Sequence, residues 1–138
     1  MNDWNILDVI NTYLAPSQAA TVRQYSPEAA REHLAEVTEY FRARILHSNT
    51  DGWDSWGVRL QHRSFTITAR FHPDHPYEPP LIFLNPQPRD PHYYVHHGET
   101  LARLCWCQPG EWHTSYRLII AVATAIRFIN DHQIGKTQ

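Results

Sequence analysis

The sequence has little of what marks several classes of protein. Two cysteines in 138 residues are too few for the disulfide framework of a small secreted domain. The longest apolar run, LIIAVATAI, has nine residues and is too short to span a bilayer. The first residues, MNDWNILDVINTYL, carry acids in place of a basic n-region, so we expect no signal peptide. These absences predict a cytoplasmic protein that has no membrane partner.

The chain also lacks a strong charge of either sign. Its formal net charge is -2, and no run of Lys and Arg is present, which argues against a nucleic-acid partner. Its ten histidines begin to charge only below about pH 6.5. Hydrophobic residues make up 42% and charged residues 19%, as in a globular protein. We therefore expect one domain, residues 1–138.

Two N-terminal segments carry apolar residues at helical spacing. The first is residues 4–14, with Asn2 or Asp3 as the N-cap. A helix this short is marginal in isolation, so it must dock on its own domain or on a partner. The second segment is predicted to begin at the Ser-Pro-Glu sequence of 26–28. There Ser can cap the helix, Pro suits its first position, and Glu complements the helix dipole. Apolar residues then recur every three or four positions, at Ala30, Leu34, Val37, Phe41 and Ile45.

From Trp56 onward the apolar period changes from 3.6 to 2. Residues 56–61 and 65–71 alternate in this way around the connection QHRS, which predicts an antiparallel hairpin. A short strand, LIFL (81–84), lies between two proline-rich passages, HPDHPYEPP and NPQPRDPHYYVHHGET. Residues 115–130 form a closing helix whose apolar face is wide enough for burial on most sides.

This order of elements predicts an α+β fold. N-terminal helices precede an antiparallel meander of three or four strands, a long loop that holds the thiols, and the closing helix. We divide the chain into an N-terminal helical extension, residues 1–25, and a core, residues 26–131.

The stretch LCWCQPGEW holds both cysteines and leaves several interpretations open. Cys105 and Cys107 could bind zinc together with His96, His97 or His113, but their spacing is not that of a zinc knuckle. In an extended chain the two thiols point to opposite faces, which also disfavours a disulfide between them. Both could instead be small buried hydrophobic residues. A fourth possibility is a nucleophile, because the thiols follow a predicted strand and precede a turn.

Two motifs carry a resemblance to a known family. FTITARFHPDHPYEPPLIFLNP resembles the strand–YPxxPP–strand passage of ubiquitin-conjugating enzymes, with Tyr77, Pro79 and Pro80 in the matching places. LCWCQPGEW is similar to the bacterial branch of that superfamily. In that branch, a proline, a glutamate and a tryptophan follow the active cysteine as Pro109, Glu111 and Trp112 follow Cys105. The resemblance covers residues 53–131.

The resemblance implies a fold and an activity. It implies a ubiquitin-conjugating-enzyme-like fold in which Cys105 forms a thioester with a protein C-terminus and passes it to an amine, without a cofactor. Trp106 and Trp112 would then be packing that shapes the pocket. The His-Pro-Asn tripeptide of eukaryotic members is missing, so the oxyanion partner must be another group. We take His97, eight residues before Cys105, as that candidate, with His96 and Tyr94 in reserve.

The resemblance also implies partners. Compact stand-alone chains of this kind resemble those of anti-phage CBASS operons. The carried protein would then be the C-terminus of a cGAS-like nucleotidyltransferase, or else a ubiquitin-like protein, supplied by an activating enzyme. Two alternatives remain: a catalytically inactive binding module of the same fold, and a small zinc-binding protein.

Overall fold

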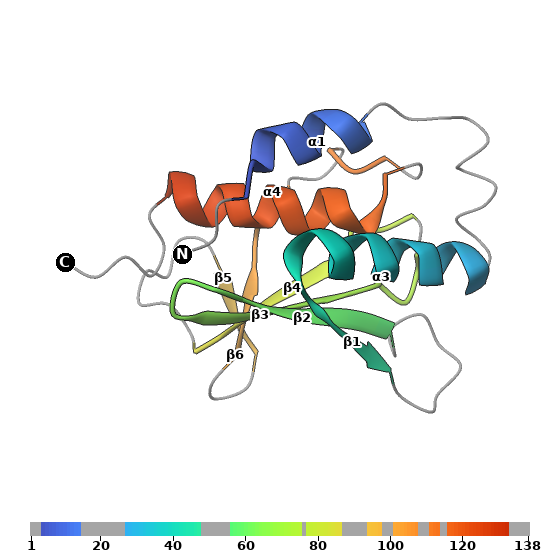
Figure 1. Cartoon of the computed structure of the whole chain (residues 1–138). Coiled ribbons are helices and arrows are strands. Elements are labelled where there is room, and N and C mark those ends of the chain that lie inside the picture. Colours follow the sequence, from blue (N-terminus) through green and yellow to red (C-terminus); the bar gives the residue numbers. More distant parts are fainter. Residues whose placement is uncertain are drawn as a thin grey trace.

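The computed structural model describes residues 4–14, 27–47, 56–75, 77–86, 94–97, 101–107, 111–113 and 116–132. Its helices are α1 (Ile6–Leu14), α3 (Pro27–Phe41) and α4 (Leu118–Asp131). Its strands are β1 (Arg44–His47), β2 (Trp56–His62), β3 (Phe65–Arg70), β4 (Leu81–Asn85), β5 (Tyr94–His97) and β6 (Leu101–Leu104). The strands form one six-stranded antiparallel sheet in the order β1-β2-β3-β4-β6-β5, and the described helices lie on one side of it (Figure 1). The predicted α+β class is confirmed.

The hairpin and the strand after it form as the period-2 pattern predicts. β2 and β3 pair so that Val58 faces Ala69 and Leu60 faces Ile67, and all four side chains are buried. Their connection is tighter than the predicted QHRS, because the strands run to His62 and from Phe65. β4 adds to β3, so the strands from β1 to β4 form a meander.

Three strands lie outside the residue ranges that the sequence assigned to strands. The helix that we expected to run to Ile45 ends at Phe41, and Arg42 then adopts the left-handed conformation, with φ 55°. β1 follows directly, which leaves Ile45 48% exposed. The long loop contains a further hairpin, β5–β6, which extends the sheet beyond β4. The sheet therefore exceeds the predicted three or four strands.

The closing helix is enveloped as predicted. α4 lies between the sheet and α1, with α3 beside it, and most of its side chains are buried (Figure 1). Val9 and Ile10 of α1 belong to the same hydrophobic cluster as the inner side chains of the sheet, α3 and α4. The described part of the predicted N-terminal extension, residues 4–14, thus contributes to the core. Within the described residues, no helix has both the length and the apolar character needed to cross a membrane.

Polar contacts define where α1 begins and hold the start of α4. Asn5, and not the predicted Asn2 or Asp3, caps α1, because its Oδ1 accepts the Asp8 backbone N–H at 3.0 Å. Arg117 is the N-cap residue of α4, but its side chain makes no capping hydrogen bond. Instead, His33 of α3 accepts the Leu118 N–H at Nδ1, at 3.3 Å. The Arg117 guanidinium also pairs with Glu36 of α3 at 2.8 Å. These contacts fix the start of α4 against α3.

Candidate functional site

Cys105 follows the last residue of β6, so the prediction that it lies at a strand end is confirmed. The ladder holds β6 on both sides: Leu84 of β4 faces Ala102, and Tyr94 of β5 faces Leu104. Cys105 is exposed and Cys107 is half-buried, and neither forms a disulfide. The interpretation of both as buried hydrophobic residues is therefore wrong. The sheet presents one accessible sulfur at a position set by backbone hydrogen bonds.

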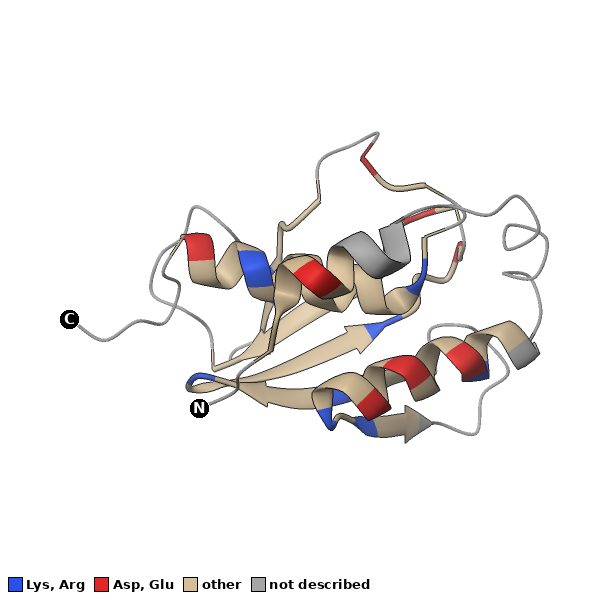
Figure 2. Cartoon of the chain, turned by 45° about the horizontal axis from the view of Figure 1, so that its top comes forward, with Lys and Arg blue, Asp and Glu red and all other residues tan. Residues whose placement is uncertain are grey.

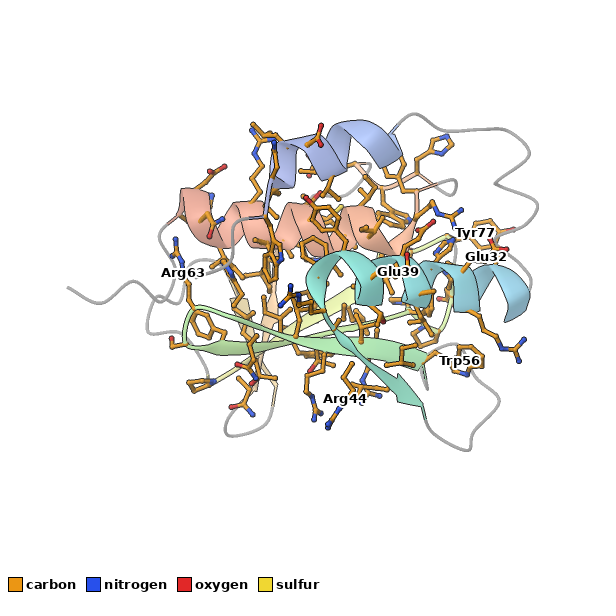
Figure 3. All side chains as sticks on the ribbon, viewed as in Figure 1. Glu32, Glu39, Arg44, Trp56, Arg63 and Tyr77 are labelled. Carbon is orange, nitrogen blue, oxygen red and sulfur yellow. The ribbon has the colours of Figure 1, made fainter. Side chains whose placement is uncertain are left out.

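A pocket of about 200 Å³ adjoins this thiol. The passage between β3 and β4 supplies one wall, with His72, Glu78, Pro79 and Pro80. The end of β6 and the residues after it supply the other, with Arg103, Leu104, Cys105, Trp106 and Cys107. The two stretches that carry the sequence resemblance, though distant in the chain, thus line one pocket. Tyr77, also part of the first motif, is 64% exposed, and Figure 3 shows it at the same end of the molecule as Glu32.

The two thiols differ in their chemistry. Burial raises the pKa of the Cys107 thiol, and the nearby Glu111 carboxylate raises it further. A raised pKa keeps Cys107 protonated at neutral pH, and the protonated thiol is the unreactive form. The exposed Cys105 is thus the better placed nucleophile of the pair.

His72 is a candidate that sequence reasoning missed. Its Nδ1 accepts the Asp74 backbone N–H at 3.0 Å, and the Asp74 carboxylate lies 4.0 Å from the same nitrogen. A neutral ring that accepts at Nδ1 carries its proton on Nε2, so His72, which lines the pocket, has one ring N–H donor. The sequence signal was the His-Pro-Asp at 72–74, where a proline turn brings a backbone N–H back to the ring.

The strand register separates His97 from Cys105. His97 faces Leu101, at the opposite end of β6 from the thiol, whereas Tyr94 faces Leu104. Four residues of extended chain separate Leu101 from Cys105, or about 13 Å. The backbone therefore brings the reserve candidate Tyr94 next to the thiol and leaves His97 distant. The side chains of Tyr94, His96 and His97 lie outside the described residues, as does Pro109.

Aromatic contacts join three of the described residues between the β6 strand and α4. Trp106 and Trp112 meet edge to face at 6.1 Å between ring centroids, and Trp112 meets Tyr116 in the same way at 5.5 Å. Both tryptophans are partly buried against the hydrophobic core, which confirms their expected packing role. The rings thus brace the pocket wall next to Cys105 against the core.

The zinc interpretation finds no ligand set in the described part of the chain. Within those residues, no group of three or more His, Cys, Asp or Glu side chains is placed to hold a metal ion. The His96 and His97 side chains, two of the ligands considered, are not among them.

Comparison of the chain with protein-family models, curated proteins and solved structures found no match. The function is therefore inferred from the site itself and from the motif resemblance.

Proposed function

We propose that this protein is a cysteine acyltransferase of the ubiquitin-conjugating type, with Cys105 as the residue that carries the acyl group. The observation that carries the proposal is the exposed Cys105 thiol in a pocket that it shares with His72 and Arg103. A thioester at this position would be open to an incoming amine. The neighbouring Cys107, whose pKa is raised, would not compete for the acyl group.

The proposed reaction has two steps. In the first, the Cys105 thiolate attacks an activated C-terminal carbonyl. A carbon–sulfur bond forms, and the thiolate of an activating enzyme leaves. In the second, an amine attacks the thioester, the carbon–nitrogen bond forms, and Cys105 leaves as a thiolate while the amine proton passes to solvent. Each attack places negative charge on the carbonyl oxygen, and the His72 Nε2–H is a donor that can stabilise it.

The fold supports the proposal at the level of architecture. A four-strand meander, a cysteine segment after it and a buried closing helix form the arrangement that the resemblance implies. The β5–β6 hairpin and α1 are additions to that arrangement. We therefore assign a ubiquitin-conjugating-enzyme-like fold as part of the proposal. Its proposed cargo is the C-terminus of a cGAS-like nucleotidyltransferase in cytoplasmic anti-phage defence, or else a ubiquitin-like protein.

The test is capture of the acyl-enzyme. The purified protein is incubated with a peptide thioester that ends in the C-terminal residues of the candidate cargo, and intact masses are recorded. We expect an adduct that hydroxylamine or excess thiol removes. Cys105→Ala should form none, whereas Cys107→Ser, the matched control, should form it at a wild-type rate. An adduct that persists in Cys105→Ala, or moves to Cys107, would refute the assignment.

A catalytically inactive binding module is the second candidate. The register favours it, because it leaves His97 distant from the thiol in a chain that also lacks the family's Asn. If the protein is such a module, the wild type and Cys105→Ala should bind the cargo C-terminus with equal affinity, and neither should form an adduct. Binding and mass measurements on the same two proteins therefore separate the candidates.

A further inference from the structure

A row of outward-facing side chains crosses the sheet on the face that the helices leave open. The strand registers place Arg44 beside Arg59, Arg59 beside Thr68, Thr68 beside Phe83, and Phe83 beside Arg103. Arg59 is exposed between the buried Val58 and Leu60, which fixes the direction of the row. Figure 3 shows Arg44 below the sheet, opposite the helices. Arginines thus stand at both ends of a row about 19 Å long, at four strand spacings.

No carboxylate of the sheet opposes these arginines. None of the described strands contains Asp or Glu. Within the described residues, Arg44, Arg59 and Arg103 form no ion pair. The red residues of Figure 2 lie on helices and loops, as the acidic residues of α3 illustrate. The net charge of -2 therefore conceals a sheet face on which the charged side chains of the described strands are arginines.

A groove of about 560 Å³ lies in this face. Its volume falls within the range of small-molecule sites, about 300–1,000 Å³. Arg59 and Arg70 supply two guanidinium groups, and Phe83 is the only aromatic or aliphatic side chain among the described residues that line it. The remaining lining is of amides and hydroxyls, from Gln61, Thr66, Thr68 and Asn85. This composition is that of a site for a polar anion that carries one flat ring.

We propose that the open face of the sheet binds nucleoside phosphates. Phe83 stacks on the base, Arg59 and Arg70 hold the phosphate, and the amides and hydroxyls bond to the edges of the base and sugar. Phe83 and Arg59 lie two strands apart, about 10 Å, which leaves room for a sugar between base and phosphate. An acidic protein segment fits less well, because protein hot spots are large apolar anchors in pockets and this groove offers one ring. The lining of the groove includes neither Cys105 nor Arg103, so the proposal does not depend on the proposed acyl transfer.

A nucleoside phosphate can reach the groove as a free nucleotide or as one nucleotide of a single-stranded nucleic acid. The test is titration of the full chain, followed by amide chemical shifts and by calorimetry, with four probes: AMP, inorganic phosphate, a thymidine decanucleotide and a deca-glutamate peptide. We expect AMP to bind more tightly than phosphate and to shift amides of β2, β3 and β4. Arg59→Gln and Phe83→Leu should each weaken AMP binding by about tenfold or more.

The controls make each outcome decisive. Arg127→Gln, which removes the same charge from α4 on the other side of the sheet, should bind AMP as wild type does, and so should Cys105→Ser. A decanucleotide that binds more tightly than AMP, with a steeper salt dependence, identifies a strand as the source, whereas equal affinity identifies the free nucleotide. The proposal is overturned if AMP binds no better than phosphate or if deca-glutamate binds more tightly than both nucleotide probes. It is also overturned if Arg127→Gln weakens binding as much as Arg59→Gln.

Discussion

The two cysteines illustrate how one intervening residue separates two chemical roles. Cys105 is exposed, whereas burial and Glu111 raise the pKa of Cys107. At pH 7 we therefore expect iodoacetamide to alkylate Cys105 faster than Cys107, because only the thiolate reacts. Peptide mapping after brief labelling measures both rates, and the Cys107 rate should rise later as pH increases. Equal rates at pH 7 would show that the burial of Cys107 does not control its reactivity.

The oxyanion donor gives a second prediction at the residue scale. His72 lines the thiol pocket with its Nε2–H available, while the register leaves His97 near the far end of β6. Loss of an oxyanion donor typically slows the chemical step by about 10²-fold or more. We expect that loss in His72→Ala and a near wild-type rate in His97→Ala, in single-turnover transfer from the Cys105 thioester. The reverse order would restore His97 as the donor.

The sequence predicted that Cys105 lies at a strand end, but it did not predict which residues lie around it in space. The cysteine lies within a motif with fixed local spacing, so Leu104, Cys105 and Trp112 could be identified along the chain. His72 belongs to the site because a passage 33 positions earlier folds over the thiol, and only tertiary structure shows that. His97 is only eight residues before Cys105 in the sequence. However, β5 and β6 run in opposite directions, so the hairpin pairs His97 with Leu101, at the end of β6 that is far from Cys105.

At the scale of elements, long periodic segments were predictable and short strands were not. α3, α4, β2 and β3 each show a clear apolar period, and all four form. β1 has four residues, and its Ile45 continues the helical spacing of the segment before it, so period alone could not end the helix at Phe41. β5 is similarly short, and its sequence YVHH gains its hydrogen bonds only from β6. Pairing with a neighbouring strand, and not local pattern, determines these elements.

α1 provides a prediction at this scale. Its Val9 is 2% exposed against α4, while Leu7 on the same helix is 54% exposed. Trp4, just before the helix, packs edge to face on Phe41 at 4.8 Å. We expect Val9→Ala to lower the free energy of unfolding by about 2 kcal/mol, because it opens a cavity. Leu7→Ala should change it by less than about 0.5 kcal/mol, and urea unfolding measures both.

The exposed side of α1 then decides whether this helix also recognises a partner. Leu7→Glu leaves the buried side untouched, so its effect on partner affinity is separate from any effect on the core. Weaker binding of the cargo protein at unchanged stability would support recognition through α1. Unchanged binding would show that α1 only completes the core.

At the scale of the whole molecule, average charge conceals an uneven distribution. The acidic side chains of α3 include Glu32 and Glu36, which engage Arg117, while the arginines of the sheet face solvent on the other side. A net charge near zero thus combines two faces of opposite character. The composition supported an expectation of no nucleic-acid partner, but it carried no information on where each charge lies. The fold supplies that information by placing successive strand residues on opposite faces.

The pH dependence of folding stability is also a property of the whole molecule, and His33 should dominate part of it. Burial lowers the pKa of His33 from 6.5 to about 3, with Arg117 and then His75 adding to the shift. The neutral ring accepts the Leu118 N–H, and His33 packs against Phe71 at 5.9 Å between centroids. Burial also lowers the pKa of His62. In the unfolded chain both histidines protonate near pH 6.5, whereas in the folded chain each takes up its proton only at a lower pH.

The sign of the effect follows from proton uptake. Between pH 6.5 and about 3 the unfolded chain binds a proton at His33 that the folded chain does not. Stability from this group is therefore complete above pH 6.5 and declines as the pH falls toward 3, by about 1.4 kcal/mol for each pH unit. His33→Asn keeps an acceptor for the Leu118 N–H but does not titrate. This variant should be less stable than wild type at pH 7. On acidification, however, its free energy of unfolding should fall less steeply than that of wild type, by about 1.4 kcal/mol less for each pH unit.

Urea unfolding at intervals from about pH 4 to pH 7 measures this difference in slope, because the carboxylates contribute equally to both proteins and cancel. The exposed His113 supplies the matched control, since His113→Asn removes a histidine that solvent reaches in both states. Its slope should equal that of wild type. A His33→Asn slope that also equals wild type would mean that His33 takes up its proton in the folded state, which the hydrogen bond from Leu118 to Nδ1 opposes.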